Sequence, residues 1–468
     1  MSEPREHLQA LEALGPAGQW ACQRIIGLTL ENLRLKEQLE AAQASNRKLE
    51  EVLAAWQRQA HRQAAPFRRA DAPRDACRGR PGRKEGHAGS FRHPPAHIDE
   101  AIHVPLESCP QCGGALCQKR PLVQYIEEIP EVHRRVTQLT TEAGWCAHCQ
   151  QEVYSTHRLQ TGRAGGAAAA QLGPRALALA CDLNKAKGLS MRQTTAILDQ
   201  HFGLKITPGA LAQLVQRVGR KLQPQYEQMA IALRQSAVVH ADETSWWVAG
   251  PGWWLWVFAT PKMTLYVVIH SRAAAVALAV LGPDFAGVLV SDCLAIYDEL
   301  NPLQQKCYSH HLKAVSEALE ILGLGAGDYL LQVQALLRTA LWLKALQGPT
   351  PGDRFALCLT TLKTRAHALL DAPRAQPIEE KVRTRLWKQR DHLFTFLERV
   401  EVPATNNLAE RQLRPAVIAR KISCGNKTAK GALAWAILAS LAATCRQTAR
   451  SVVDAISTQI RLQPVRGP

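Results

Sequence analysis

Two aspartates that end short apolar runs are the first residues in this sequence that could carry out chemistry. Asp242 follows residues 237–241, and Asp292 follows residues 287–291. Short runs rich in Val and Leu predict buried strands. A buried carboxylate is costly unless it is paired or bound to a metal, and two side by side repel each other unless a divalent cation lies between them. The pair therefore indicates a site for a divalent cation at the ends of two strands.

A third carboxylate, Glu410, has two interpretations. Asn407 can cap a helix and Glu410 falls three residues later, which is the spacing of a capping box, so Glu410 could be a cap partner. Alternatively, Glu410 is a third metal carboxylate, carried on a helix that packs against the two strand ends. In that case the basic side chains nearby form a rim for phosphates. They are Arg411, Arg414, Arg420 and Lys421.

Two Cys-x-x-Cys pairs indicate a metal of a different kind. The pairs are Cys109 with Cys112, and Cys146 with Cys149. Two such knuckles separated by roughly thirty residues are typical of a zinc ribbon, in which four thiolates bind one Zn²⁺. All four positions around the ion are then filled, so we expect a structural zinc, with a hairpin at residues 123–141. Cys117 and His148 are possible substitute ligands.

Cys307 and His310 lie just before a long segment, residues 312–400. This segment is rich in Leu, with Arg and Lys at other positions. This pattern predicts long helices, and the segment is too long for a loop inside a compact core. We interpret it as a helical insertion. The Cys307/His310 pair could brace its start or touch a metal, and packing is the commoner role for such a pair, so we assign both residues as a structural brace.

The elements around the two aspartates can bring them together. Residues 253–259 and 263–270 predict two further strands, and residues 272–281 predict a helix. Three consecutive strands can pair antiparallel, and a fourth strand that returns after a crossover helix can lie parallel beside the first. That order would place Asp242 and Asp292 at one edge of the sheet, as in a ribonuclease-H-like core.

The N-terminal part of the chain carries a heptad pattern. Between residues 20 and 60, Ile25, Asn32, Leu39, Asn46 and Leu53 share one heptad position, and Leu28, Leu35, Ala42, Leu49 and Trp56 share its partner. Two Asn on an otherwise apolar line are the usual register device of a parallel dimeric coiled coil. The alternative is a helix that packs on its own protein.

Two segments have both a DNA-binding interpretation and a plainer one. The Arg-, Pro- and Gly-rich residues 61–95 include Arg78, Arg80, Arg83 and Lys84, which could enter a minor groove or form a solvated basic linker. Residues 190–201 and 207–221 resemble a helix-turn-helix, with Thr207 before Pro208 as a good helix start. The alternative is a helical hairpin that bridges two domains.

Composition favours a nucleic-acid partner. The chain has 468 residues and a formal net charge of +17, which favours a polyanion. No run of about 18 apolar residues is present, so we expect no membrane span. The N-terminus has no apolar signal region, and the 13 Cys are an odd number, mostly in core-like contexts. We therefore expect reduced thiols in a cytoplasmic protein.

Several of these motifs together resemble the transposases of the bacterial insertion sequence 66 (IS66) family. The resemblance covers nearly the whole chain and includes the N-terminal zipper, the basic linker and the zinc ribbon in that order. Its motifs are residues 240–244 (HADET), 288–292 (VLVSD), the Cys307/His310 pair, 406–415 (NNLAERQLRP), 420–423 (RKIS) and 425–426 (GN).

The resemblance implies a DDE-type transposase with a ribonuclease-H-like core, in which Asp242, Asp292 and Glu410 are the catalytic triad. Three carboxylates can hold two Mg²⁺ or Mn²⁺ ions about 4 Å apart. One ion would activate water or a DNA 3′-hydroxyl, and the other would stabilise the leaving oxygen of the phosphodiester. The implied partners are the element's terminal repeats, target DNA and accessory proteins of the same element.

Two alternatives to a transposase follow from the same features. The zipper, ribbon and basic linker would suffice for a DNA-binding regulator or end-binding accessory protein with an inactive core. The same core would also suit a structure-specific nuclease. An assay with both element ends separates them, because a regulator binds without cutting and a nuclease cuts without joining.

The sequence thus predicts a multidomain α+β protein. Its parts are a coiled-coil dimerisation helix (1–60), a basic flexible linker (61–100), a zinc ribbon (101–160), a helical region with a helix-turn-helix as one interpretation (161–230), a ribonuclease-H-like catalytic domain (231–450) with a helical insertion (about 312–400), and a C-terminal tail (451–468).

Overall fold

The computed structural model describes residues 92–161, 170–300, 303–323, 328–348 and 352–461, together with scattered positions between 15 and 46. The chain forms two compact units, Met1–Glu127 and Glu128–Pro468. In the first unit, the described positions from 24 to 46 are helical, and Leu28, Leu35 and Leu39 of the heptad are exposed in the single chain. The other heptad residues lie largely outside the described positions, as do Arg78, Arg80, Arg83 and Lys84.

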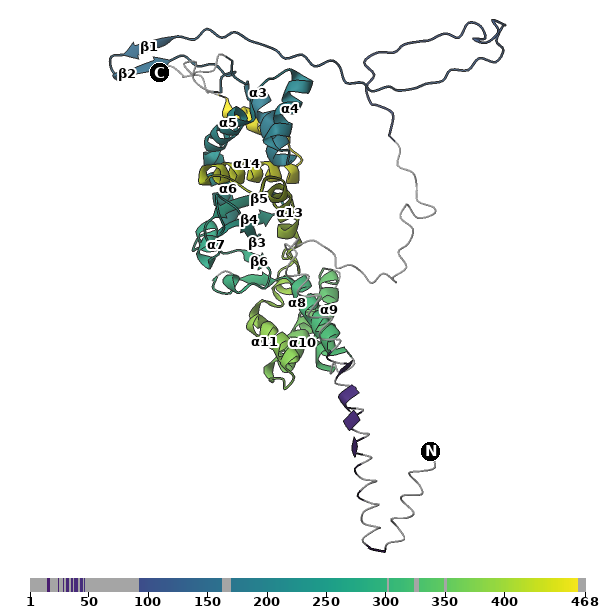
Figure 1. The fold of residues 1–468 in the computed structure, drawn as a ribbon, viewed down its shortest axis with the longest axis vertical. Helices are drawn as coiled ribbons and strands as arrows, with labels where there is room; N and C mark the ends of the chain where they lie inside the picture. The colour runs from purple at the N-terminus through teal and green to yellow at the C-terminus, as the bar shows by residue number, and fades with distance from the viewer. Residues whose placement is uncertain are drawn as a thin grey trace. The chain divides into compact units, whose positions relative to one another are not determined.

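A five-stranded sheet forms the centre of the second unit (Figure 1). Its strands are β3 (Val238–Trp246), β4 (Trp253–Thr260), β5 (Met263–Ile269), β6 (Val288–Ser291) and β7 (Gln304–Lys306). The order across the sheet is β5-β4-β3-β6-β7. Strands β3, β4 and β5 pair antiparallel, and β6 returns after helix α7 (Ala274–Leu281) to lie parallel beside β3. The pairing predicted for the first four strands is confirmed.

Strand β7 was not predicted, because its three residues are polar. Gln304, Gln305 and Lys306 are all buried, and each side chain has a polar partner. Gln304 donates to two backbone carbonyls, Gln305 Nε2 donates to Lys306 O, and Lys306 Nζ lies 3.0 Å from an Asp298 carboxylate oxygen. Pairing of this kind allows buried polar residues to form a strand without a hydrophobic pattern.

The two faces of the sheet are covered by different helices. Helices α13 (Asn407–Ser423) and α14 (Ala429–Gln447) pack on one face, where the Trp246 and Trp435 rings lie 4.6 Å apart. Helix α6 (Gln223–Arg234) and α7 contribute to the apolar core on the other face, together with Val239 and Ala241. Because strand side chains alternate, the odd- and even-numbered residues of β3 point to opposite faces.

A separate group of helices extends from the end of β7. These helices are α8 (Tyr308–Leu322), α9 (Asp328–Ala345), α10 (Gly352–Asp371), α11 (Pro377–Lys388) and α12 (Thr395–Glu398), with the 3-10 turn η4 (Arg390–His392). Their buried Leu, Val and Phe side chains form a hydrophobic core that adjoins β6 at Val288 and Val290. In Figure 1 the helices α8 to α11 gather at one end of the sheet. They lie in the segment for which the sequence predicted long helices.

A second helical layer contains elements from the N-terminal part and from the C-terminal part of this unit. It contains α3 (Pro174–Cys181), η1 (Asp182–Ala186), α4 (Met191–Phe202), α5 (Pro208–Lys221) and α15 (Val452–Ile460). Helix α5 begins as predicted, since the Thr207 hydroxyl accepts the Ala210 N–H at 3.2 Å. Its face with Leu211, Val215 and Val218 is buried in the same core as α14. This burial favours the interpretation as a helical hairpin, and DNA binding by this region stays a prediction.

Two assignments made from the sequence need correction. Residues 451–468 were assigned to a tail, but Val452, Ile456 and Ile460 fall at a four-residue spacing and give α15 a buried stripe. The prediction of a hairpin at residues 123–141 is wrong, because these residues have no regular structure. A hairpin forms instead at β1 (Ala143–Cys146) and β2 (Gln151–Tyr154). The side chains of residues 123–140 are all exposed, so pairing of this segment would bury no apolar face that could stabilise it.

The described helices do not include one with both the length and the hydrophobicity that crossing a membrane requires.

Candidate active site

Asp242 and Asp292 lie at matching positions on neighbouring parallel strands. His240 of β3 pairs with Val290 of β6, so the same register continued by two residues sets Asp242 opposite Asp292. Asp242 is half-buried and accepts the Glu243 N–H at 2.8 Å. Asp292 accepts the Leu294 N–H at 3.0 Å, which fixes the turn after β6. The structure therefore brings the two aspartates together, as the sequence predicted.

The charge on Asp242 is unfavourable in this setting. Burial raises the pKa of the Asp242 carboxyl well above its usual range, and the neighbouring Asp292, Glu243 and Glu410 carboxylates raise it further. The contribution of Glu410 also indicates that the three expected site carboxylates share one region. Carboxylates gathered in this way favour a bound cation that neutralises them.

Glu410 lies in the first turn of α13, but the capping box that was one of its two interpretations is absent. The N-cap residue of α13 is Asn406 rather than Asn407, and no side chain caps this helix end. The Asn406 side chain turns toward β3 instead. Its Nδ2 donates to Ala241 O at 2.8 Å, and its Oδ1 accepts from His240 Nδ1 at 3.1 Å. Glu410 is therefore not a cap partner in this structure, which favours its interpretation as a metal carboxylate.

Asn406 is a positioning residue that sequence reasoning missed. It is fully buried, and its backbone N–H donates to Cys307 Sγ at 3.3 Å. One residue thus connects the strand of Asp242, the start of α8 and the helix of Glu410. The motif with two adjacent Asn was the available signal, but only the packing shows which Asn is buried.

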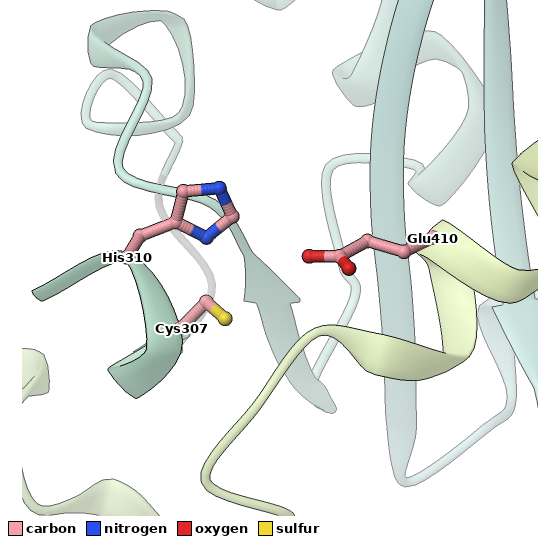
Figure 2. Close-up of side chains that lie close together, drawn as sticks. All are labelled: Cys307, His310 and Glu410. Carbon is pink, nitrogen blue, oxygen red and sulfur yellow. The ribbon is translucent and has the colours of Figure 1, made fainter. Parts of the chain in front are cut away.

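Cys307 and His310 lie beside the carboxylates. Cys307 is the fully buried N-cap residue of α8, and its N–H donates to Ser291 O at 2.9 Å. Although burial raises it, hydrogen bonding with His310 and Asn406 holds the pKa of the Cys307 thiol below its ordinary value. Interaction with the thiol, and then Asp292 and Glu410, raise the pKa of His310. Figure 2 shows the Glu410 carboxylate pointing toward this pair.

Among the described residues, one group of three potential metal ligands has all its ligand atoms within 4.8 Å of one another, and it is Cys307, His310 and Glu410. Within the same described ranges, Asp242, Asp292 and Glu410 do not converge that tightly. The Glu410 side chain is therefore grouped with the thiol and imidazole more closely than with the two aspartates.

Glu243 faces the opposite side of β3 from Asp242. Its buried carboxylate accepts from Arg272 Nη2 at 2.8 Å and from Tyr297 Oη at 2.7 Å. The Arg272 guanidinium in turn stacks over Trp254, 4.3 Å from the ring centroid. Glu243 thus anchors the segment that follows Asp292, and strand alternation excludes it from the face of Asp242.

The four basic residues expected near Glu410 are not equivalent. Arg411, Arg414 and Lys421 are exposed on α13. Arg420 is half-buried and donates to Thr244 Oγ1 at 3.0 Å and Ser245 Oγ at 2.9 Å, so it ties α13 to β3. Its guanidinium is occupied in this way, which makes it a weaker candidate for phosphate contact than the exposed Arg411 and Lys421.

The two cysteine knuckles lie in different units. Cys109 and Cys112 belong to the first unit, where the Cys109 N–H donates to Gly114 O at 3.0 Å. Cys146 and Cys149 belong to the second, where the Cys149 N–H donates to Cys146 Sγ at 3.4 Å. An N–H that donates to sulfur within a tight turn is compatible with a thiolate ligand. The zinc ribbon stays a prediction.

Comparison with known proteins decides the family. A family model described as Transposase IS66 family matches residues 169–434, which is more than half of the chain. The chain belongs to the IS66 transposase family. The matched range includes the three carboxylates of the site and the Cys307/His310 pair, whereas the IS66 model does not extend to the cysteine knuckles or the heptad segment.

One relative of this IS66 chain is the uncharacterized protein y4qI of Sinorhizobium fredii (strain NBRC 101917 / NGR234). The two are 24% identical over 312 residues, which is 58% of this chain and 56% of that protein. This chain therefore spans little more than half the length of that relative.

Proposed function

We propose that the protein is a DDE-type DNA transposase, which binds the ends of its own insertion sequence and catalyses metal-dependent DNA cleavage and strand transfer. The observation that carries the proposal is the matched position of Asp242 and Asp292 on parallel strands, with Glu410 on the helix that packs against the same face. The strand order supports a ribonuclease-H-like core.

The donor set of the site fits Mg²⁺ or Mn²⁺. Asp242, Asp292 and Glu410 offer only oxygen, which hard cations prefer. The raised pKa of Asp242 supports the same conclusion, since its ionised form needs a neighbouring positive charge. When bound there, a divalent cation would supply charge neutralisation for the nucleophile and leaving oxygen of a phosphodiester.

The side chains of the protein would position the reacting groups. Asn406 holds the start of α13 against β3, which positions Glu410 in the first turn of this helix. The exposed Arg411, Arg414 and Lys421 on the same helix would contact DNA phosphates. Catalysis of this kind rests on positioning and charge, with no covalent link between protein and DNA.

Other parts of the chain would assemble the complex on DNA. We infer a structural Zn²⁺ on Cys109, Cys112, Cys146 and Cys149, and a homodimer or higher oligomer through the heptad segment. The net charge of +17 supports DNA as the partner, with Arg78, Arg80, Arg83 and Lys84 as further contacts. Accessory proteins of the same element are candidate partners, and the cytoplasm is the expected compartment.

The test is a cleavage and joining assay with the full chain, a DNA that carries both element ends, and Mg²⁺. A transposase cuts at the ends and joins the 3′ ends to target DNA. End binding without cutting would assign the protein as a regulator, and cutting without joining would assign it as a nuclease.

A further inference from the structure

The Cys307, His310 and Glu410 cluster has the composition of a second metal site. It draws on two separate elements, because Cys307 and His310 begin α8 and Glu410 lies in the first turn of α13. Their ligand atoms all lie within 4.8 Å of one another (Figure 2). This separation is close to the spacing of ligands around a single tetrahedral ion, so small side-chain rotations would complete the site.

Hydrogen bonding within the described part of the chain leaves one atom of this cluster unexplained. His310 Nδ1 is buried, and among the described residues no nitrogen or oxygen atom is its hydrogen-bond partner, so the Cys307 thiol is the group that interacts with this ring. A buried polar atom of this kind normally requires a partner, and a metal ion is one. The neighbouring His311 is not part of the cluster, since its ring lies against Cys293, with Sγ 3.6 Å from Nε2.

The thiol already has the environment of a metal-bound sulfur. The Asn406 N–H donates to Cys307 Sγ at 3.3 Å, and outer-shell hydrogen bonds of this kind orient ligands and stabilise thiolates. Cys307 is also held through its backbone to Ser291. The sulfur is therefore fixed in place, and the Glu410 carboxylate would complete the set of ligands.

The chemistry of the donors selects a different ion from the one at the aspartates. Sulfur and imidazole nitrogen favour borderline cations such as Zn²⁺ and Co²⁺, whereas the carboxylates of Asp242 and Asp292 favour Mg²⁺. Glu410 is the one residue that could serve both sets. In this structure the carboxylate of Glu410 lies close to Cys307 and His310. Binding of Glu410 to one ion would therefore compete with its binding to the other.

We propose that Cys307, His310 and Glu410 bind one borderline divalent cation of the Zn²⁺ class, and that this ion withdraws Glu410 from the two aspartates. The first half stands on the cluster alone. The second half rests on the proposed catalytic function of Glu410, and it makes Zn²⁺ an inhibitor of DNA cleavage. Three protein ligands leave a fourth position for water.

Metal binding tests the first half without any measurement of activity. The full chain is stripped of metal, reloaded with Co²⁺, and compared with Cys307→Ser and His310→Gln by metal content and by thiolate-to-cobalt charge-transfer absorption. We expect Cys307→Ser to hold one Co²⁺ fewer per chain, and His310→Gln to bind that ion at least about tenfold more weakly. Cys293→Ser is the matched control, because this thiol lies nearby but outside the cluster, and it should keep the parental content.

A variant without the four knuckle cysteines measures metal binding at the proposed site alone. In a chain with Cys109, Cys112, Cys146 and Cys149 all replaced by Ser, we expect one Zn²⁺ per chain with a single sulfur ligand in its X-ray absorption spectrum. Equal metal content in the folded parent, Cys307→Ser and His310→Gln would overturn the site. A four-Ser chain that folds, as judged by its melting curve, and holds no Zn²⁺ would overturn it as well.

Inhibition tests the second half. With Mg²⁺ fixed, added Zn²⁺ should lower DNA cleavage by the parent about tenfold or more, while Cys307→Ser should retain a larger fraction of its own rate without Zn²⁺. Equal fractional losses in both proteins would overturn the competition. A chain that never cleaves with Mg²⁺ would overturn the proposed function and the competition with it, whereas the metal content decides the site separately.

Discussion

Asn406 joins three parts of the candidate site through one side chain and one backbone group. Its amide binds His240 and Ala241 on β3, and its N–H binds the Cys307 thiol. Because all of these groups are buried, replacing the amide would leave polar atoms without partners at a cost of about 1–3 kcal/mol each. The position of Glu410, four residues along the chain, depends on this arrangement.

Glu410→Gln separates a catalytic role from a structural one. Gln can replace Glu in helix packing and hydrogen bonding, but its neutral amide cannot balance a divalent cation. We expect the variant to fold and bind element ends, and to lose at least about a hundredfold in cleavage rate with Mg²⁺. Asp242→Asn and Asp292→Asn should behave alike, and the losses should not add because the residues act together.

Glu317→Gln is the matched control for this change. Glu317 is an exposed glutamate of α8 that pairs only weakly with Lys313, at 3.7 Å. Its substitution should leave cleavage at the parental rate. Near-parental cleavage by Glu410→Gln on a pre-bound end substrate would remove Glu410 from the triad.

His240 makes the stability of the protein depend on pH. Burial lowers the pKa of His240 to about 4, and nearby Arg411 also lowers it, while the hydrogen bond with Asn406 acts in the opposite direction. Between the unfolded pKa of about 6.5 and the folded value of about 4, the unfolded state binds more protons. The contribution of His240 to the stability of the fold is therefore fully present above about pH 6.5. It is lost as the pH falls toward 4, by up to about 3 kcal/mol.

His240→Asn should reduce this acid sensitivity, since the Asn amide N–H can replace Nδ1–H toward Asn406. The measurement is the urea midpoint of both proteins from pH 7 to pH 4. Buried His311, whose pKa burial lowers to about 3, contributes in the same window, so part of the slope remains in the variant. Identical slopes for the two proteins would exclude His240 as a contributor.

At the scale of elements, the close approach of α5 and α14 fixes the helical layer to the sheet. A Cβ placed on Gly219 would lie 2.8 Å from the Ala434 Cβ, which is too close for any side chain. Helix α14 also packs on β5, where the Ser440 hydroxyl accepts the Tyr266 N–H at 2.8 Å. The spacing of α5 therefore depends on one glycine.

Gly219→Val should force α5 away from α14 and destabilise the protein by about 1–3 kcal/mol. Gly209→Ala on the same helix provides the contrast, because a Cβ there has no neighbour within 4 Å. That change should be neutral or slightly stabilising, since Ala favours helix more than Gly does. Thermal melting of the two variants measures the difference, and an equal melting temperature for Gly219→Val and the parent would contradict the close packing.

At the scale of the whole molecule, the exposed leucines of the heptad segment favour pairing with a second copy of the chain. Leu28, Leu35 and Leu39 are 43%, 55% and 57% exposed in the single chain, whereas Asn32 Nδ2 donates to Leu28 O at 3.2 Å. Exposed leucines at this spacing are buried when two such helices pair. We expect a parallel dimer whose register is set by Asn32 and Asn46.

Replacing Asn32 and Asn46 with Leu should raise the melting temperature of this segment and produce a mixture of oligomers. Analytical ultracentrifugation of residues 20–60, with and without the substitutions, is the measurement. A parental segment that stays monomeric at high concentration would contradict the dimer.

The zinc ribbon gives a second prediction at this scale. One Zn²⁺ bound by Cys109, Cys112, Cys146 and Cys149 would supply much of the folding free energy of its segment, because the exposed strands β1 and β2 have little packing of their own. Chelation should therefore increase proteolysis near residue 150 and leave the five-stranded sheet intact. Cys109→Ser combined with Cys146→Ser should release this ion, and unchanged zinc content in that variant would exclude the ribbon.

The sequence by itself determined the central part of the fold and the two aspartates. Alternating and apolar runs specify strands locally, and a crossover helix between them leaves few ways to pair, so β3 beside β6 and Asp242 opposite Asp292 could be predicted. The long helices after Cys307 follow from the same local periodicity.

Only the tertiary structure decided which polar residues are buried and what they contact. Strand β7 is polar, α15 is short, and Asn406 and Arg420 bond to β3 across more than 150 positions of sequence. Local pattern carries no information about such partners, because their stability comes from contacts that exist only after the chain has folded. For the same reason Glu410 was expected with two aspartates, and its proximity to Cys307 and His310 became visible only when α8 and α13 were brought together.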